Sequence, residues 1–217
     1  MKIAAIVPVK TFERAKSRLG LGHEKTVNLC NIMLKEVLSA LTGSSAIDTV
    51  TIVSREPLAE TVASEFGVDI IPDKSESGVN NAVALGEAHY ANKGHDGLLV
   101  VPQDLPLLMS TDVDELVRLS CRPPCVTVVP SRMLDGTNAL LRAPSNSMPT
   151  RYDEGSYLAH MQEARKHNLN PLLVYQRRVM ADIDSIDDIE YCIKLGEKPQ
   201  ICEQIAYIAH VNSSIDK

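Results

Sequence analysis

The sequence lacks the residue spacings that mark a zinc site or a disulfide framework. It has six histidines but no HExxH motif, and five cysteines but no CxxC pair. An odd cysteine count without metal spacing is typical of a reducing compartment, so we expect reduced and mostly buried thiols. Cys121 and Cys125 flank two prolines and are only a weak candidate for a redox pair. These absences argue against a histidine-based zinc enzyme.

Long apolar runs and an excess of basic residues are also missing. No segment approaches the roughly 20 apolar residues of a membrane span, and the N-terminus, MKIAAIVPVK, is too short for the apolar region of a signal peptide. We therefore expect a cytoplasmic protein without membrane contact. The net charge of −6 argues against a general nucleic-acid binder. A phosphorylated small substrate remains compatible with it, because a local basic cluster can act against the overall sign.

Two common glycine-rich nucleotide motifs, GxxxxGK[ST] and GxGxxG, do not occur. The chain instead alternates strand and helix patterns, which favours an α/β fold with a mainly parallel sheet and helices on both faces. With 217 residues, 44% of them hydrophobic, it can bury a sizeable core. We predict strands at 3–9, 49–54, 68–71, 98–101 and 125–130, and helices at 24–41, 57–66, within 78–94 and at 112–120, the last capped by Ser110 or Thr111.

The pattern changes after Pro130. Residues 138–143 fit a strand, 155–167 a helix and 171–176 another strand. The tail at 197–217 fits an extra strand or helix and is a candidate subunit contact. No repeat, linker or low-complexity segment divides the chain, so we predict one domain over residues 1–217.

Asp104 follows the apolar strand at 98–101 directly, in LLVVPQDLPLL, where Pro102 and Pro106 prevent the strand from continuing. One interpretation is a turn residue that hydrogen-bonds the backbone. The other is a metal ligand, because open α/β sheets bind ligands at the carboxyl ends of their parallel strands.

A second group of acids lies in ADIDSIDDIE. Asp182 and Asp184 are two residues apart, so in an extended segment they point to the same side. Two carboxylates this close repel each other unless a cation or a proton lies between them. Asp184 can also be read as the N-cap of the following helix, with Asp187 and Asp188 in its first turn. Together with Asp104, the pair forms a candidate all-oxygen magnesium site.

A basic segment, PVKTFERAKSRLG, follows the first strand and carries Lys10, Arg14, Lys16 and Arg18 within nine residues. It is either a solvated loop or a cradle for a triphosphate. The position of the segment favours the triphosphate cradle, because the segment follows the first strand at the same sheet edge that Asp104 should occupy.

Small and neutral polar residues recur in GVNNA, LDGTNAL and GSYLAH. Glycine allows close approach of the backbone to a ligand, neutral amides and hydroxyls suit a base, a ribose or a phosphate, and a helix start binds anions. Each residue alone also suits a plain turn or cap. The candidates are Gly78, Asn80, Gly136, Thr137, Asn138, Gly155 and Ser156.

A set of short motifs, taken in their order along the chain, resembles the 2-phospho-L-lactate guanylyltransferase family of coenzyme F420 biosynthesis. The motifs are PVK with KSRL, G-x-N-x-A, D-x-P, DGTN, GS-x-x-x-H and DID. No single motif is specific, but the ordered set spans residues 8–184. The resemblance implies a Rossmann-like nucleotidyltransferase fold, a magnesium-dependent enzyme and a homodimer. It also implies transfer of GMP from GTP to 2-phospho-L-lactate, or to phosphoenolpyruvate in some members, with release of diphosphate.

The resemblance and the chemistry together assign expected roles. A nucleotidyl transfer to a phosphate needs no general base, because that phosphate, with a second pKa of about 6, is already largely a dianion. We expect Lys16 and Asp104 to be catalytic. The expected ligands are Lys10, Lys16, Arg18, Gly78 and Asn80 for the nucleotide, Asp104, Asp182 and Asp184 for magnesium, and Thr137, Gly155 and Ser156 for the acceptor.

Two positions depart from the family pattern. Asp153 follows Tyr152 where the family usually has glycine, and Gln103 precedes Asp104 where the family often reads GDxP. Two alternative functions remain open: a nucleotidyltransferase with a molybdopterin or sugar phosphate acceptor, and a nucleotide-binding regulator without turnover. The presence of all three acids disfavours the regulator, and DID with DGTN favours the phospholactate type.

Overall fold

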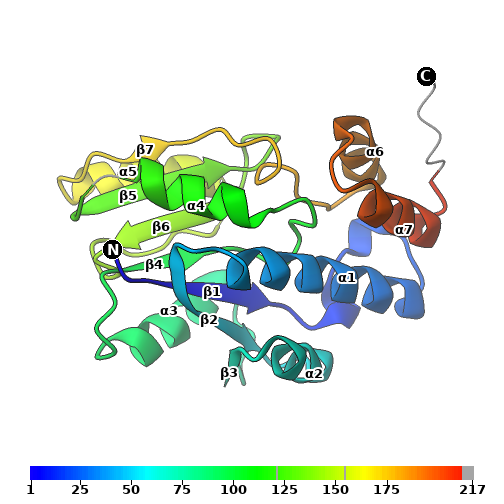
Figure 1. Cartoon of the computed structure of the whole chain (residues 1–217), viewed down its shortest axis with the longest axis horizontal. Coiled ribbons are helices and arrows are strands. Elements are labelled where there is room, and N and C mark those ends of the chain that lie inside the picture. The colour runs from blue at the N-terminus through cyan, green and yellow to red at the C-terminus, as the bar shows by residue number, and fades with distance from the viewer. Residues whose placement is uncertain (121, 154, 212–217) are drawn as a thin grey trace.

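The computed structural model describes residues 1–120, 122–153 and 155–211, apart from the side chain of Arg14. Figure 1 shows a central sheet with helices on both of its sides. Cys121, one half of the weak redox-pair candidate, falls outside the described residues. Cys30, Cys192 and Cys202 are free thiols, and these three and Cys125 are buried, as predicted. Within the described ranges, none of the helices combines the length and the apolar character needed to cross a bilayer.

The sheet has seven strands in the order β3-β2-β1-β4-β6-β5-β7. Among the described strands, only β6 runs antiparallel to its neighbours, β4 and β5. The sheet is therefore mixed but mostly parallel, in agreement with the prediction. Its members are β1 (Ile3–Val9), β2 (Ile47–Ser54), β3 (Asp69–Pro72), β4 (Gly97–Val100), β5 (Cys125–Pro130), β6 (Thr137–Ala143) and β7 (Leu172–Leu173).

Helices cover both faces of this sheet. One face carries α1 (His23–Thr42), α2 (Pro57–Phe66), α4 (Ser110–Leu119), α6 (Ile186–Leu195) and α7 (Pro199–Ala209), and the other carries α3 (Val79–Tyr90) and α5 (Ser156–Lys166). β1 is buried along its whole length because it lies between the two layers. Ala5 and Val7 belong to the α1 side and Ala4 and Ile6 to the α3 side, as the two-residue period of a strand requires.

Two predictions about elements are wrong, and one of the two interpretations left open for Asp184 is excluded. Met109, not Ser110 or Thr111, holds the N-cap position of α4, where its N–H donates to Asp112. Ser185, not Asp184, is the N-cap of α6, because its N–H donates to Asp188 at 2.8 Å in a capping box. The predicted strand at 171–176 is only two residues long.

The tail after residue 197 is helical over α7, which Pro199 begins and which packs against α1 and α6. The prediction had left strand and helix open for this segment. Residues 212–217 lie outside the described residues.

The fold brings several loops to one edge of the sheet. β1, β2, β3 and β4 are parallel, so their carboxyl ends meet there. The loop after β1 contains two short 3-10 helices, η1 (Phe12–Arg14) and η2 (Ser17–Leu19). Because β6 is antiparallel to β4, its first residue, Thr137, lies at the same edge.

Candidate active site

Two pockets open at the carboxyl ends of β1 and β4. The larger pocket has a volume of about 430 Å³ and the smaller pocket one of about 230 Å³. Pro8, Val79, Pro102 and Asp104 line both, so the pockets adjoin, with Asp104 at their junction. Open α/β sheets bind their ligands at this edge.

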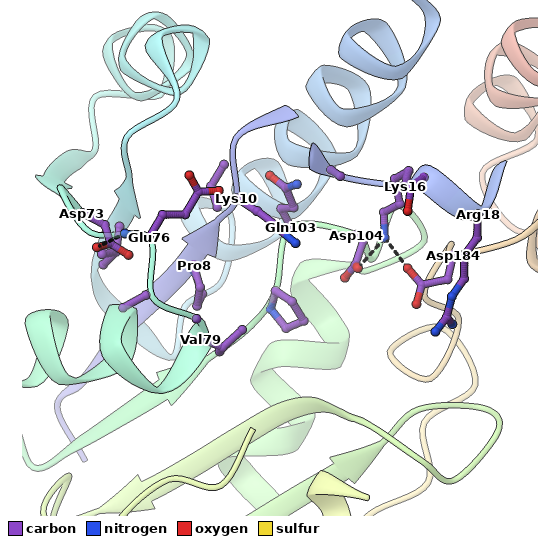
Figure 2. A pocket seen from close by; sticks show the side chains of 17 residues that line it. Pro8, Lys10, Lys16, Arg18, Asp73, Glu76, Val79, Gln103, Asp104 and Asp184 are labelled. Atoms are coloured by element: carbon purple, nitrogen blue, oxygen red, sulfur yellow. Dashed lines mark hydrogen bonds and ion pairs between the residues drawn. The ribbon is translucent and has the colours of Figure 1, made fainter. Parts of the chain in front are cut away.

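The larger pocket carries the basic residues of the loop after β1 (Figure 2). Lys10, Lys16 and Arg18 line it, as does Gly78 at the start of α3. The structure therefore gathers four of the five residues that we predicted to bind the nucleotide. The side chain of Arg14 is not described.

Lys16 forms the electrostatic centre of the larger pocket. Its ammonium donates to Asp104 Oδ2 at 2.6 Å and to Asp184 Oδ1 at 2.7 Å, and only 5% of its side chain is exposed (Figure 2). Burial lowers the pKa of Lys16, but the two carboxylates outweigh burial and raise this pKa above its ordinary value. Lys16 therefore stays charged at neutral pH.

The three predicted metal ligands surround the junction of the pockets. Asp184 lines the larger pocket, Asp182 the smaller one and Asp104 both. The N–H of Ile183 donates to the backbone carbonyl of Asp104 at 3.1 Å, which holds the two acidic segments together. Burial, followed by the charge of Asp104, raises the pKa of Asp182 to about 6.

A hard cation fits this donor set. Asp104 Oδ1 is buried and has no hydrogen-bond partner among the described residues, so it has a free lone pair for a cation. In the described part of the chain, no group of three acidic, histidine or cysteine side chains is arranged to hold a metal by itself. A magnesium site does not require a full protein cage, because the ion commonly takes one or two carboxylates and completes its shell with water and substrate phosphates.

The smaller pocket presents neutral hydroxyls. Ser156 Oγ donates to Thr137 Oγ1 at 3.0 Å, and both residues are buried, with exposed fractions of 4% and 5%. Gly155 precedes α5 with a φ of 67°, a left-handed conformation that favours glycine, and does not itself line the pocket. The carboxylate-bearing Asp153, one of the two departures from the family pattern, does line it.

Two predicted residues have structural partners. Asn138 Nδ2 donates to Asp182 Oδ1 at 2.9 Å, so it orients that carboxylate within the smaller pocket. Asn80 lines neither pocket; its Oδ1 accepts a hydrogen bond from the N–H of Tyr152 at 2.9 Å. Asn80 thus ties the start of α3 to the segment that carries Asp153.

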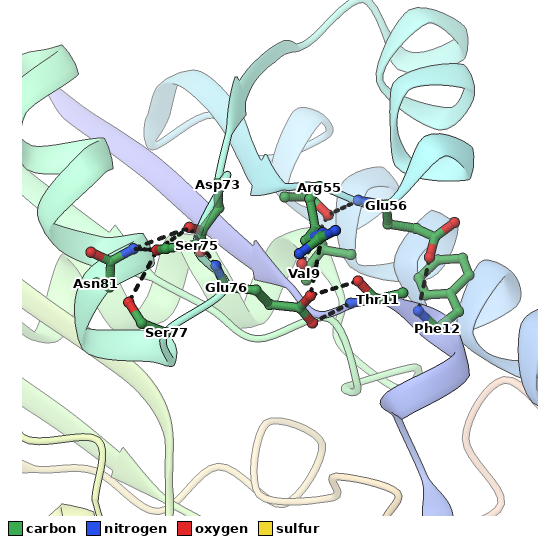
Figure 3. A network of polar contacts seen from close by, with 11 residues as sticks. Val9, Thr11, Phe12, Arg55, Glu56, Asp73, Ser75, Glu76, Ser77 and Asn81 are labelled. Atoms are coloured by element: carbon green, nitrogen blue, oxygen red, sulfur yellow. Dashed lines mark hydrogen bonds and ion pairs between the residues drawn. The ribbon is translucent and has the colours of Figure 1, made fainter.

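Acidic residues anchor the basic loop (Figure 3). The N–H and hydroxyl of Thr11 donate to Glu76 at 2.9 and 2.7 Å, and the N–H of Phe12 donates to the buried Glu56 at 2.8 Å. Asp73 in turn accepts from the N–H of Glu76 at 3.0 Å. These contacts hold the start of the loop against the ends of β2 and β3.

Sequence reasoning missed four residues that line or support the pockets. Asp73, Glu76 and Gln103 line the larger pocket, and Glu56 supports its loop. Glu76 and Glu56 bind Thr11 and Phe12, which lie far away in the chain, so no local spacing singles these two acids out. The one available signal was an acid shortly after the end of a strand, which Glu56 and Asp73 share with Asp104.

Comparisons with known proteins agree with this geometry. A family model described as "Guanylyl transferase CofC like" matches residues 3–210. The chain is 35% identical to a phosphoenolpyruvate guanylyltransferase of Conexibacter woesei, over 88% of this chain and 86% of that protein. It is 28% identical to a 2-phospho-L-lactate guanylyltransferase of Methanocaldococcus jannaschii, over 87% of this chain and 81% of that protein.

Solved structures agree on the fold. A nucleotidyl transferase from Methanothermobacter thermautotroptrophicus superposes with a TM-score of 0.64 at 15% identity, over 95% of this chain and 98% of that one. Such a likeness confirms the predicted nucleotidyltransferase fold and says nothing about the acceptor. The family match covers nearly the whole chain, and the chain therefore belongs to the CofC-like guanylyl transferase family.

Proposed function

We propose that the protein transfers GMP from GTP to phosphoenolpyruvate or 2-phospho-L-lactate and releases diphosphate, with magnesium as its cofactor. One observation carries the proposal: the pocket that contains Lys10, Lys16 and Arg18 and the pocket that contains the hydroxyls of Thr137 and Ser156 adjoin at Asp104. Such a pair can hold a triphosphate and a small phosphorylated acid end to end. Membership of the CofC-like family supports a role in coenzyme F420 biosynthesis.

The larger pocket takes GTP in this proposal. Lys10, Lys16 and Arg18 neutralise the triphosphate, and Gly78 allows the phosphates or ribose to approach the backbone at the start of α3. Lys16 stabilises the charge that develops on the leaving diphosphate, because its ammonium is already buried and oriented before the reaction.

The smaller pocket takes the acceptor. Thr137 and Ser156 offer uncharged donors to its carboxylate or phosphate, with Gly155 shaping the start of α5. An oxygen of the acceptor phosphate attacks the α-phosphorus of GTP, the bond between the α-phosphorus and the bridging oxygen breaks, and diphosphate leaves with the electron pair. This step requires no general base.

Asp104, Asp182 and Asp184 would hold magnesium. The ion, when bound, would neutralise phosphate charge around the α-phosphorus. The chain's own contribution is to hold the segment of Asp182 beside Asp104 through the backbone contact of Ile183, and to orient Asp182 through Asn138.

The proposal includes a homodimer. The resemblance to the family motivates it, and α7 offers a surface for it, since 83% of Tyr207 is exposed. Light scattering after size exclusion would measure the mass. A dimer that Tyr207→Asp dissociates would support the predicted subunit contact, and a monomer at micromolar concentration would contradict it.

A diphosphate-release assay tests the function directly. The four nucleoside triphosphates are each paired with phosphoenolpyruvate and with 2-phospho-L-lactate, and Asp104→Asn serves as the inactive control. We expect release with GTP and with at least one of the two acceptors. Release only with a sugar phosphate or molybdopterin would favour the first alternative, and binding of GTP without release would favour the regulator.

A further inference from the structure

His160 is a buried histidine that the proposed mechanism does not use. It lies in the second turn of α5, its side chain is completely inaccessible to solvent, and its ring packs edge-on against Tyr152 at 4.8 Å. Both ring nitrogens have partners. Nε2 lies 2.8 Å from the backbone nitrogen of Arg151, and Nδ1 lies 3.0 Å from Thr137 Oγ1.

The contact with Arg151 determines which ring nitrogen carries the proton. A backbone N–H can only donate, so Nε2 of His160 has to accept and is unprotonated. In a neutral imidazole the proton is then on Nδ1, and the Nδ1–H donates to Thr137 Oγ1. Burial, followed by the charge of Arg142, lowers the pKa of His160 to about 4, which keeps the ring neutral at physiological pH.

Thr137 therefore accepts two hydrogen bonds on one oxygen. The first comes from Nδ1 of His160 and the second from Ser156 Oγ, each at 3.0 Å. Both lone pairs of the hydroxyl are occupied, so its own proton has to point elsewhere. None of the described residues accepts a hydrogen bond from Thr137 Oγ1, and Thr137 lines the smaller pocket.

We propose that His160 is a positioning residue that holds the Thr137 hydroxyl as an obligatory hydrogen-bond donor into the smaller pocket. A donor of fixed direction binds a deprotonated oxygen of a carboxylate or phosphate more strongly than a hydroxyl, because hydrogen bonds to a charged acceptor are stronger. The inference deepens the proposed function and rests on its assignment of the smaller pocket to the acceptor.

Two substitutions separate the two contacts of the ring. In His160→Gln, the side-chain amide reaches the position of Nε2 and can still accept from Arg151, but the donor to Thr137 is lost. In His160→Asn, the amide reaches the position of Nδ1 and can still donate to Thr137. We expect His160→Gln to raise the KM for the acceptor about tenfold and to leave the KM for GTP unchanged. His160→Asn should raise the KM for the acceptor less than His160→Gln does.

A double substitution tests whether His160 acts through Thr137. If it does, adding His160→Gln to Thr137→Val costs little beyond Thr137→Val alone, because the hydroxyl to be oriented is already gone. A purely structural role predicts that the two effects multiply. Full additivity would overturn the proposal.

The tautomer can be measured without any enzyme activity, so it separates this inference from the proposed function. In ¹⁵N spectra of the full chain at neutral pH, with His160→Gln to assign the signals, we expect a protonated Nδ1 and an unprotonated Nε2. A proton on Nε2 would overturn the inference even in an active enzyme. The expected tautomer in a protein that uses neither acceptor would contradict only the proposed function.

Discussion

The ammonium of Lys16 bridges two carboxylates from distant segments, lying 2.6 Å from Asp104 and 2.7 Å from Asp184. This contact joins the loop after β1 to the segment after β4 and to the start of α6. It concentrates charge of both signs at the junction of the two pockets. Substitutions there should therefore affect catalysis before they affect the fold.

Lys16→Ala should raise the KM for GTP and lower turnover by about 10²–10³-fold, as expected when one preorganised donor to developing charge is removed. Arg18→Ala, at the same pocket but outside the bridge, should weaken GTP binding with a smaller loss of turnover. The KM for the acceptor should change less than that for GTP in both. Steady-state kinetics with each substrate varied in turn measures these effects. Unchanged GTP affinity in both variants would mean that the loop after β1 is solvated and does not bind the triphosphate.

Substitutions that remove the charge of a proposed metal ligand should lower turnover. Asp104→Asn, Asp182→Asn and Asp184→Asn should each reduce turnover by orders of magnitude, with a small change in the Tm. Asp188→Asn is the matched control, because Asp188 caps α6 and pairs with Arg132. It should cost about 1 kcal/mol of stability and little activity. A fully active Asp182→Asn variant would eliminate the shared-metal model.

Glu56 allows a test of loop anchoring away from the pockets themselves. It accepts from the N–H of Phe12 and lines neither pocket. Glu56→Ala leaves that buried N–H without its acceptor, which should lower the free energy of unfolding by about 1–3 kcal/mol and raise the KM for GTP. Glu56→Gln keeps one acceptor oxygen and should have milder effects. Equal effects of the two variants on the KM for GTP would count against the anchoring role.

Part of the fold and site follows from local sequence. The apolar run of β4 ended by Pro102 predicted both a buried strand and the location of Asp104. The two-residue spacing of Asp182 and Asp184 predicted side chains that point to the same side; Asp182 lines the smaller pocket and Asp184 the larger one, so a shared metal stays a prediction. Strand direction did not follow, because β6 is antiparallel through its long-range pairing with β4 and β5. That reversal is what brings Thr137 to the site edge.

Other features depend on competition between neighbours in the chain. Asp184 and Ser185 both suit an N-cap, and the capping box with Asp188 selects Ser185, which leaves Asp184 available to Lys16. His160 was visible only as a position in GS-x-x-x-H. Its function depends on a backbone N–H nine residues away in the chain, a partner that no side-chain pattern reveals.

The buried ring of His160 should make stability depend on pH. Its pKa falls from 6.5 in the unfolded chain to about 4 in the fold, so the unfolded state binds more protons between these values. The contribution is fully present above about pH 6.5 and is lost as the pH falls toward 4, by on the order of 3 kcal/mol. Chemical denaturation at several pH values compares the wild type with His160→Gln. We expect the free energy of unfolding to fall less steeply with decreasing pH in the variant than in the wild type. Identical dependence of this free energy on pH in the two proteins would argue against a neutral buried histidine.

Thr137 and Ser156 should determine acceptor binding and leave GTP binding nearly unchanged. They line the smaller pocket only, on the far side of Asp104 from the cationic loop. An uncharged donor is suited to this position, because a strong cation would hold the attacking phosphate in its ground state.

Thr137→Val and Ser156→Ala should therefore each raise the KM for phosphoenolpyruvate or 2-phospho-L-lactate by about ten- to a hundredfold, the effect of losing one hydrogen bond to a charged group. Thr137→Ser is the matched control, since it keeps the hydroxyl and removes only a methyl group. It should retain an acceptor KM close to that of the wild type. Loss of GTP affinity with retained acceptor affinity would mean that the two pockets bind the substrates in the opposite arrangement.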